Sequence, residues 1–303
     1  MIDLASAADY VRLFRGATFV LKVGGACLER PGLVAELARQ IAVIDACGAH
    51  PVLVHGAGPQ VDQVQRSLGE EPVKVAGRRV TTEAALGALA EVARGTIGPT
   101  LAGELRRCGA AARLVPAEEV VTARRRPPVE TEAGVVDFGL VGDIVAVDAA
   151  PLTALTAAGE IPILSPPVRG EDAADARLNA NADLLAAHLA GALGAEKLVL
   201  VTTARGVLTD PNDPRSAIST LSLADIDGFE ARGSIVGGMK VKVAAARQAL
   251  DAGVPRVHVV SGIEHEALLG ELFTTHGTGT LVTSEPEEPP APPATGELQG
   301  AQA

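Results

Sequence analysis

Two lysines and one aspartate stand beside glycine-rich segments in this sequence. Lys22 follows the apolar run "FVL" and precedes Gly24 and Gly25, Lys242 ends "GGMKVK", and Asp183 ends "LNANAD". Glycine lets backbone N–H groups approach phosphate or carboxylate oxygens closely, and an ammonium group neutralises the charge of such anions. The combination is typical of a site for small anions. A lone lysine after an apolar run is ordinarily a surface residue, so other motifs must support this interpretation.

Four glycine clusters follow expected strands or open expected helices. They are "KVGG", "HGAGP", "TTARG" and "GGMKVK". None has the spacing of a Walker loop, and "HGAGPQ" lacks the third glycine of a dinucleotide fingerprint. One glycine pair alone indicates no more than a turn, but four clusters with two lysines and one aspartate beside them are a stronger signal.

The elements that must position these residues alternate along the chain. Short apolar runs predict buried strands, and apolar residues at helical spacing between them predict helices. Such alternation predicts an α/β fold with a parallel sheet that helices cover on both faces, and ligands then bind beyond the carboxyl ends of the strands. The expected strands are 19–23, 51–54, 111–115, 161–165, 197–201 and 256–260; the expected helices follow 31, 59, 183 and 242 or span 82–94 and 100–108.

Residues 119–148 interrupt the alternation. Their β-rich ends flank a Pro and Gly turn region, which predicts an antiparallel hairpin that stands off the main sheet. We expect the run Arg124–Arg126 to form the solvated tip of this hairpin, with a lid or a partner contact as the alternative. His188, on an expected helix, and His258, in an apolar strand, are interpreted as packing residues.

Composition excludes several classes of function. The 303 residues include 47% hydrophobic residues, no Trp and a formal charge of −11, which argues against a nucleic-acid groove. No apolar stretch reaches about 18 residues, and the N-terminus lacks the pattern of a signal peptide, so neither a membrane nor export is indicated. Cys27, Cys47 and Cys108 fit neither a disulfide framework nor a metal site, and we expect reduced, half-buried thiols in the cytoplasm.

The motifs, taken in order, resemble those of the amino-acid kinase family, and within it the N-acetylglutamate kinases. The resemblance covers roughly residues 10–283 and rests on "VLKVGG", "HGAGP", "GRRVT", "LNANAD", "GGMKVK" and "ELFTTHGTGTLV". It implies a three-layer α/β/α sandwich with a mainly parallel sheet, the amino-acid kinase fold, preceded by an N-terminal helix. It also implies an N-lobe for the acyl amino acid, about 18–170, and a C-lobe for ATP, about 171–284. The tail 285–303, rich in Pro and Glu, is expected to be disordered.

The resemblance also implies a reaction and its catalytic residues. These enzymes transfer the γ-phosphoryl group of ATP, with Mg²⁺ held mainly by the nucleotide, to the γ-carboxylate of N-acetyl-L-glutamate. A carboxylate is ionised at neutral pH, so the reaction needs positive charge and alignment rather than a general base. By resemblance, Lys22 acts from the acceptor side, Lys242 acts near the leaving oxygen of ATP, and Asp183 lies between the two ammonium groups. Lys240 is the competing lysine, and we expect it to be solvated.

Substrate and nucleotide contacts are carried over from the same motifs. The acceptor would be held by the Ala57 and Gly58 amides, Arg79 and Asn179, because a guanidinium suits an α-carboxylate. The nucleotide site would comprise Gly24, Gly25, Thr202, Thr203, Gly206, Gly238 and Met239. The sequence departs from the family pattern at Ala57, where a third glycine is usual, and at Thr203, where an aspartate is frequent. An alanine with positive φ at position 57 would cost about 1 kcal/mol or more.

Regulation and assembly are further implications of the resemblance. Arginine-inhibited members carry an N-terminal helix, here 1–17, that links dimers into a hexamer, and they bind arginine near a motif that Glu271 and Gly279 fit. His265 lies one residue from the usual histidine position. Tyr10, Leu13 and Phe14 form an apolar stripe that either packs on the core or serves this assembly. Two other functions stay open: a kinase for an aminoadipate derivative, and an arginine-sensing module without catalysis.

Overall fold

A mainly parallel sheet forms the centre of the molecule. The computed structural model describes residues 4–75, 78–131, 134–274 and 277–285. Eight strands follow the order β14-β16-β15-β13-β1-β2-β10-β5, in which only the β15–β16 pairing is antiparallel. Their bounds are β1 Thr18–Val23, β2 His50–His55, β5 Ala111–Leu114, β10 Glu160–Leu164, β13 Lys197–Thr202, β14 Thr220–Ser222, β15 Arg256–Ser261 and β16 Thr280–Thr283.

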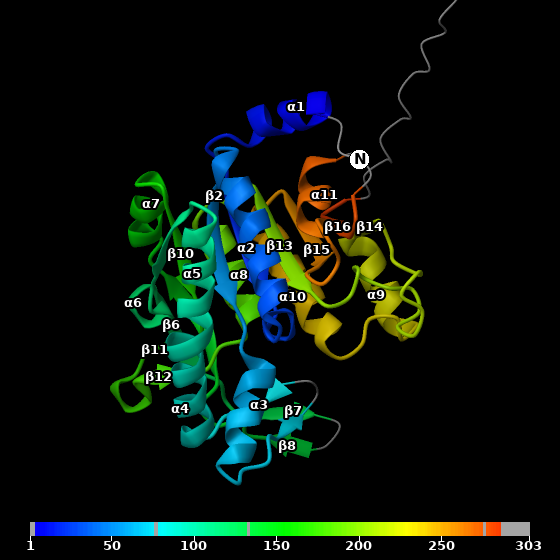
Figure 1. The fold of residues 1–303 in the computed structure, drawn as a ribbon. Coiled ribbons are helices and arrows are strands. Elements are labelled where there is room, and N and C mark those ends of the chain that lie inside the picture. The colour runs from blue at the N-terminus through cyan, green and yellow to red at the C-terminus, as the bar shows by residue number, and fades with distance from the viewer. Residues whose placement is uncertain (1–3, 76–77, 132–133, 275–276, 286–303) are drawn as a thin grey trace, which may run out of the picture.

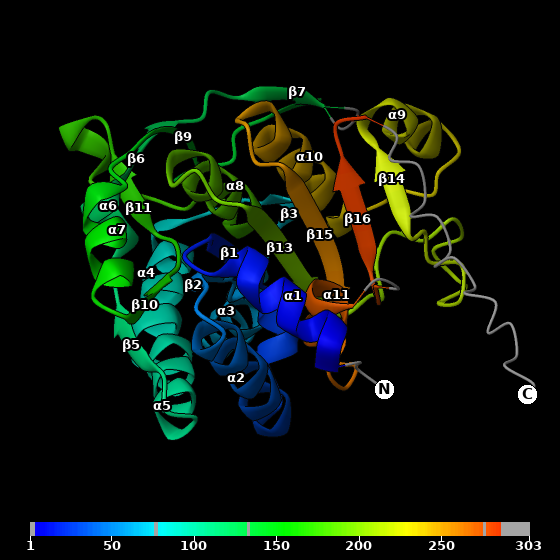
Figure 2. The same cartoon turned by 90° about the horizontal axis from the view of Figure 1, so that it is seen from above.

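Helices cover both faces of this sheet, so the expected three-layer α/β/α architecture is confirmed (Figures 1 and 2). One face carries α1 Leu4–Phe14, α2 Pro31–Ala46, α4 Glu83–Val92, α5 Gly98–Arg107 and α11 Ala267–Phe273. The other carries α7 Ala150–Ala157, α8 Ala182–Ala192, α9 Leu223–Ala231 and α10 Gly238–Asp251. Of the remaining helices, α3 is Gly58–Ser67 and α6 is Ala117–Val120, with short 3₁₀ turns at Gly25–Leu28 and Ala173–Asp175.

The central strand shows how the sequence builds the two cores. Successive side chains of a strand point to opposite faces. In β1, Phe19 and Leu21 are buried in the core beneath α2, whereas Val20 is buried in the core beneath α8 and α10. Lys22 also lies in this strand, paired with Val54 of β2 and Leu200 of β13. The apolar run therefore fixes a lysine at the carboxyl end of the central strand.

Helix boundaries differ in an informative way from those expected. We expected helices after the glycine-rich motifs, but α3, α8 and α10 begin inside them, at Gly58, Ala182 and Gly238. The motif residues therefore form the first turns themselves. The two helices expected at 82–94 and 100–108 are joined by a π-helical turn at Ala93–Ile97, so the residues between them are helical as well.

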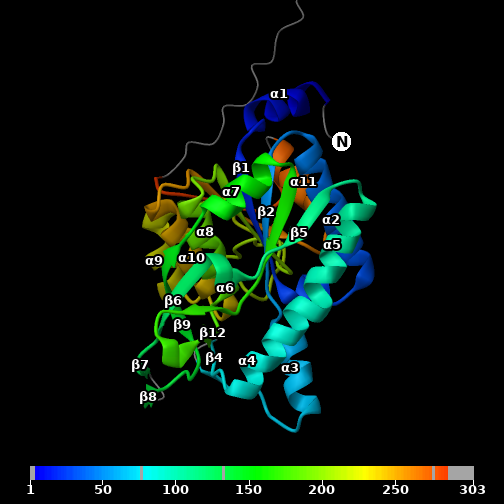
Figure 3. The same cartoon turned by 90° about the vertical axis from the view of Figure 1, so that its left-hand side faces the viewer.

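A smaller sheet lies beside the main one, with the order β12-β11-β6-β9. Its strands are β6 Val121–Arg125, β9 Gly142–Val147, β11 Val168–Gly170 and β12 Arg177–Leu178. The antiparallel β6–β9 pair confirms the expected hairpin. Two further short pairs are β3 Lys74–Val75 with β4 Arg78–Arg79, and β7 Val129–Thr131 with β8 Gly134–Val136 (Figure 3).

The arginine run is not the tip of this hairpin, and that expectation is wrong. Beyond β6 the chain continues into the β7–β8 pair, which lies farther from the main sheet (Figure 3). Arg124 pairs with Glu171, Arg125 with Asp175 and Arg126 with Asp143. The run is anchored by acidic partners because three consecutive arginines at the end of a strand reach side chains on both neighbouring strands and loops.

Helix α1 packs on the protein's own core through part of its apolar stripe. The Phe14 side chain is 1% exposed and contacts Phe19 and Phe273 edge to face, while Tyr10 stacks on Phe14. Leu13, by contrast, is 66% exposed. The stripe expected from three residues therefore divides into two that face the core and one that faces outward.

Other expectations concern the cysteines, the membrane and the tail. The cysteines are free, as expected, but Cys27 is buried, Cys47 half-buried and Cys108 exposed. Across the described ranges, no helix combines the length and apolarity that a bilayer crossing requires. The expected disordered tail lies, apart from Glu285, outside the described residues. The division into N- and C-lobes near residue 170 stays a prediction.

Candidate active site

A cavity of about 540 Å³ opens where the carboxyl ends of the central strands meet the first turns of three helices. Lys22 reaches it from β1, the Gly56–Gly58 turn from the end of β2, and Thr202 and Thr203 from the end of β13. Parallel strands bring their carboxyl ends to one edge, which explains why motifs distant in the chain converge here. This cavity contains most of the residues that the sequence motifs single out.

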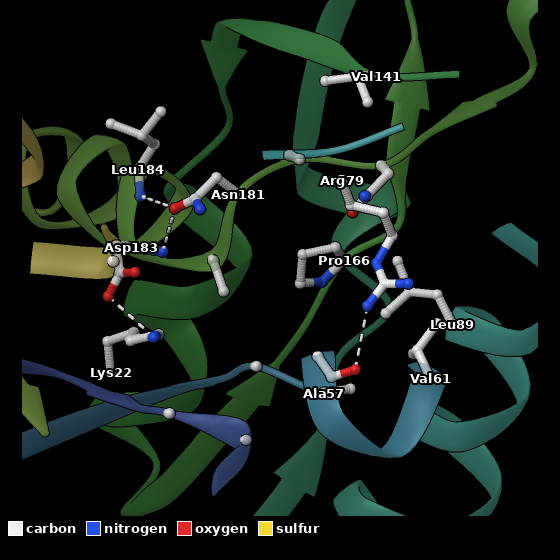
Figure 4. Close-up of a pocket in the computed structure, with 18 of the residues that line it drawn as sticks. Lys22, Ala57, Val61, Arg79, Leu89, Val141, Pro166, Asn181, Asp183 and Leu184 are labelled. Carbon is white, nitrogen blue, oxygen red and sulfur yellow. Dashed lines mark hydrogen bonds and ion pairs between the residues drawn. The ribbon is translucent and has the colours of Figure 1, made fainter. Parts of the chain in front are cut away.

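The structure brings the two lysines and the aspartate together at the inner end of the cavity. The Lys22 Nζ lies 2.8 Å from Asp183 Oδ1, and the Lys242 Nζ lies 3.5 Å from Asp183 Oδ2. The three side chains are 6%, 12% and 7% exposed for Lys22, Lys242 and Asp183. Figure 4 shows the Lys22–Asp183 contact. Lys240, the competing lysine, is exposed, as expected.

Electrostatics keep this cluster charged. Burial alone would raise the pKa of Asp183, but Lys22 and Lys242 outweigh it and hold that pKa below its ordinary value. Burial lowers the pKa of Lys242, and Asp183 opposes this shift. One carboxylate between two ammonium groups leaves one net positive charge, so the inner end of the cavity attracts anions.

Helix N-termini add partial positive charge at the same place. In α8, the Asn181 side chain caps the helix by accepting hydrogen bonds from the Asp183 and Leu184 amides. Gly238 begins α10, after Gly237, whose φ of 53° favours glycine. Since the first amides of a helix lack intrahelical partners, both first turns offer N–H groups to an anion.

Gly24 and Gly25 serve different purposes. A Cβ on Gly25 would lie 2.9 Å from Gln60 Oε1 and 3.1 Å from Gly58 N, so glycine is needed for close packing against the start of α3. Both glycines line the cavity, but the Gly24 N–H already donates to Val201 O at 3.0 Å. Because this hydrogen bond continues the β1–β13 ladder, the Gly24 amide is already engaged within the sheet, and Gly24 borders the cavity through its backbone alone.

Arg79 lies across the cavity from the lysines, beside Val61, Leu89 and Pro166 (Figure 4). Its guanidinium donates to Asp62, Gln65 and Gly58 O, and the side chain is 12% exposed. The other expected acceptor residues also line this cavity: Ala57, Gly58 and Asn179.

Two of these acceptor residues are fixed by local geometry. Asn179 Nδ2 donates to Thr81 Oγ1 at 2.9 Å. Ala57 has a φ of −142°, so the departure from glycine at this position costs no backbone strain. The alanine therefore preserves the turn and its amide.

The expected nucleotide residues divide into two groups. Thr202, Thr203 and Gly238 line the same cavity as the lysines. Gly206 and Met239 are not among its lining residues. A Cβ on Gly206 would lie 2.4 Å from Thr280 Oγ1, so this glycine allows a close approach between the loop after β13 and strand β16. Close packing therefore explains why this position is a glycine.

The expected effector residues lie elsewhere, in a buried polar cluster beside α1. Glu271 Oε2 accepts hydrogen bonds from the Thr278 and Gly279 amides, and Glu271 Oε1 lies 2.7 Å from His258 Nδ1. His258 Nε2 lies 3.1 Å from the Lys197 Nζ. We expected His258 to be a packing residue, but α11 and β13 each bring a polar partner to its ring. Its burial lowers its pKa, although Glu271 opposes that shift.

Sequence reasoning missed several residues around the cavity. Asp62 and Gln65 accept hydrogen bonds from Arg79, and Lys74 donates to Asp62. None of the three belongs to a motif that indicated a role. His188 lines the cavity and is half-buried, which differs from the packing role that we expected. Burial lowers the pKa of His55, next to the glycine turn, to about 4, so this histidine is neutral at physiological pH.

Comparison with known proteins identifies the family of this chain. The model of the amino acid kinase family matches residues 17–261. The acetylglutamate kinase of Myxococcus xanthus is 42% identical over 95% of this chain and 96% of its own length. That of Symbiobacterium thermophilum is 38% identical over 92% and 96%.

Solved structures share the fold. An N-acetylglutamate synthase from Neisseria gonorrhoeae, complexed with coenzyme A and N-acetylglutamate, superposes with a TM-score of 0.80 at 30% identity. It covers 93% of this chain, which spans 63% of the synthase chain. Giardia carbamate kinase superposes with a TM-score of 0.62 at 19% identity, over 89% of this chain and 99% of its own, which shows a shared fold. This chain belongs to the amino acid kinase family.

Proposed function

We propose that this protein is an ATP-dependent acetylglutamate kinase. It would transfer the γ-phosphoryl group of ATP to the γ-carboxylate of N-acetyl-L-glutamate and form N-acetyl-L-glutamyl 5-phosphate, a reaction of arginine biosynthesis in the cytoplasm. Relatives of that name are 42% and 38% identical over nearly the whole chain. The observation that carries the proposal is the pair of buried lysines that share Asp183 at the inner end of the cavity.

The chemistry that this cluster must perform is charge neutralisation. A new P–O bond forms to the acceptor carboxylate while the bond from the γ-phosphorus to the β–γ bridging oxygen breaks. Because the acceptor is already ionised, no proton has to be removed. Lys22 neutralises charge on the acceptor side, and Lys242 does so at the leaving oxygen. Asp183 holds both ammonium groups in place, and the Gly25 amide adds a donor.

The acceptor is held at the opposite end of the cavity. Arg79 pairs with the α-carboxylate, and Asn179 and the amides of Ala57 and Gly58 bind its polar groups. Val61, Leu89 and Pro166 supply apolar surface beside the guanidinium for the methylene and acetyl groups. A free amine on the substrate would meet this apolar wall and the Arg79 charge, which favours an acylated amino acid.

ATP would lie over the first turns of α8 and α10, with Gly24, Gly25, Thr202, Thr203 and Gly238 of the cavity lining as its binding residues. Gly206 and Met239, which do not line the cavity, would be outer members of the same site. The residues around the cavity fit a Mg²⁺ ion that the triphosphate itself holds. Both oxygens of Asp183 are paired with lysines, so the carboxylate nearest the phosphates is already engaged. The ion would supply additional positive charge to the phosphate oxygens when bound.

Arginine is proposed as an effector, with Glu271 and Gly279 in its site. The N-acetylglutamate synthase that shares the fold has also been solved with L-arginine, at 30% identity and a TM-score of 0.79. Glu271 lies in a buried cluster with His258, and the Lys197 Nζ of that cluster lies 5.1 Å from the centroid of the Phe14 ring of α1. Arginine bound there would therefore act on the position of α1.

Assembly is part of the same proposal. The exposed Leu13 gives α1 an apolar side chain directed away from its own core. We propose a homodimer, and we propose that α1 links such dimers into a hexamer. Arginine bound beside α1 would then affect other subunits through this helix.

The proposed function is tested by trapping the acyl phosphate with hydroxylamine. The purified protein is incubated with Mg-ATP and, separately, with N-acetylglutamate, glutamate, aspartate and N-acetyl-aminoadipate. Hydroxamate formed from N-acetylglutamate alone, and lost in Lys22→Ala, is the expected result. Turnover of N-acetyl-aminoadipate in preference would point to a different acceptor. No product from any acceptor, with arginine binding intact, would identify a sensing module instead.

A further inference from the structure

Asp62 holds two cations at the acceptor end of the cavity. It lies on α3, one turn beyond the glycine motif, and is 8% exposed. Its Oδ2 accepts a hydrogen bond from the Lys74 Nζ at 2.7 Å, and its Oδ1 accepts one from Arg79 Nη2. Lys74 and Arg79 line the cavity, but Asp62 does not. The carboxylate therefore stands behind the residues that a ligand would touch.

The Arg79 guanidinium is fixed by further contacts from the same helix. Its Nη2 also donates to Gly58 O at 3.1 Å, and its Nη1 donates to Gln65 Oε1. An arginine side chain loses much rotamer freedom when it is held, and a short two-residue strand such as β4 gives little support of its own. The contacts from α3 are thus what determine the direction of the guanidinium.

The charges in this group do not cancel. Burial would raise the pKa of Asp62, but Lys74 and Arg79 outweigh it and hold the pKa below its ordinary value, so the carboxylate is ionised. Two cations around one anion leave one net positive charge. An Asp62–Arg79 pair alone would be neutral and would attract a carboxylate ligand only weakly.

We infer that Asp62 is a positioning residue that aims Arg79 at the α-carboxylate of the acceptor, and that Lys74 supplies the charge that keeps the pair cationic. The inference rests on the proposed function, because Arg79 is the proposed anchor of N-acetylglutamate. It adds two residues that act through Arg79 rather than on the phosphoryl group. Their loss should therefore weaken acceptor binding and spare the chemical step.

The test is the kinetics of Asp62→Asn, which keeps the shape and removes the charge. We expect KM for N-acetylglutamate to rise about tenfold or more, because a charge-assisted hydrogen bond that orients the anchor is lost. KM for ATP and kcat should stay within about twofold of wild type. Lys74→Gln should raise the KM for N-acetylglutamate by a smaller factor. The difference in this KM between Lys74→Gln and wild type should become smaller at high salt, because the Lys74 side chain is 49% exposed.

Two further variants separate positioning from a general structural effect. Asp45→Asn changes a half-buried aspartate on α2, outside the cavity, and should leave every constant unchanged. In an Arg79→Ala background, Asp62→Asn should cause no further loss of kcat/KM, since it acts through the missing guanidinium. Losses that multiply, or a fall in kcat with KM unchanged, would overturn the inference while leaving the proposed function intact.

Failure of the proposed function has a different signature. If the wild-type protein neither turns over N-acetylglutamate nor binds it in calorimetry, the proposed function falls and the inference falls with it. If wild type turns over N-acetylglutamate and Asp62→Asn has the same KM, only the inference falls.

Discussion

Removing the charge of Asp183 should change the pH at which the enzyme works. Asp183→Asn keeps the shape of the side chain but leaves the ammonium groups of Lys22 and Lys242 in one buried space without a counter-charge. The wild-type carboxylate lies 2.8 Å and 3.5 Å from them, and its side chain is 7% exposed. One of the two lysines must then lose its proton or move apart, because uncompensated buried charge is costly.

The size of the effect follows from these distances. At 3.5 Å and an effective dielectric constant of about 20, the lost attraction is about 4 to 5 kcal/mol, and water entering the cavity would reduce it. Burial already lowers the pKa of Lys242, and Asp183 opposes that shift. Without Asp183 the pKa of Lys242 should therefore fall further, because the attraction that favours the ammonium form is lost while the burial remains.

The assay is hydroxamate formation at saturating substrates from about pH 6 to about pH 9. The active form of Lys242 is the ammonium, so the variant should lose activity as pH rises through the lowered pKa and recover part of it at acid pH. In wild type, Asp183 opposes the lowering of the Lys242 pKa, so any such loss should begin at a higher pH than in the variant. Asp45→Asn serves as a matched control and should follow wild type. A wild-type rate and pH profile in Asp183→Asn would refute the reasoning.

Three other outcomes are expected. Lys242→Ala should lower kcat by about 100-fold or more, whereas the exposed Lys240→Ala should keep it, and equal losses in both would contradict the assignment. Gly25→Ala should cost about 1 to 3 kcal/mol in urea unfolding, because its Cβ would meet a side-chain oxygen at 2.9 Å, whereas Gly32→Ala meets nothing within 4 Å and should be neutral or stabilising. Burial holds the pKa of His55 at about 4, below the ordinary 6.5, so the unfolded chain binds the proton first. Stability should be complete above about pH 6.5 and fall by up to about 3 kcal/mol towards pH 4, and His55→Asn should lack that part of the loss.

The architecture was predictable from local pattern. Alternating apolar runs and helical periods located the six parallel strands, because fully buried strands read as continuous apolar segments. The β14–β16 edge was not predicted, because three- and four-residue strands at an edge carry no distinct period. The place of Arg124–Arg126 was missed for a similar reason: a run of charges indicates solvent unless the acidic partners on other elements are known.

The candidate site was predictable only in part. Lys22, Asp183 and Lys242 stand in recognisable motifs, and the geometry of parallel strands brings them together. Asp62 and His258 carry no such signal. From the sequence alone, Asp62 is an ordinary residue on the polar face of a helix, and His258 is a polar residue within an apolar strand. Their partners lie on other elements and are known only from the fold.

The central claim is that two ammonium groups, held by Asp183, act on opposite sides of the transferred phosphoryl group. It is tested most directly by a crystal structure with ADP, Mg²⁺, tetrafluoroaluminate and N-acetylglutamate. The account predicts that the Lys22 Nζ contacts fluorine atoms from the acceptor side, that the Lys242 Nζ contacts them from the ADP side, and that Asp183 touches both lysines. Planar fluoroaluminate bound with either lysine turned away, or with Asp183 touching neither, would contradict it.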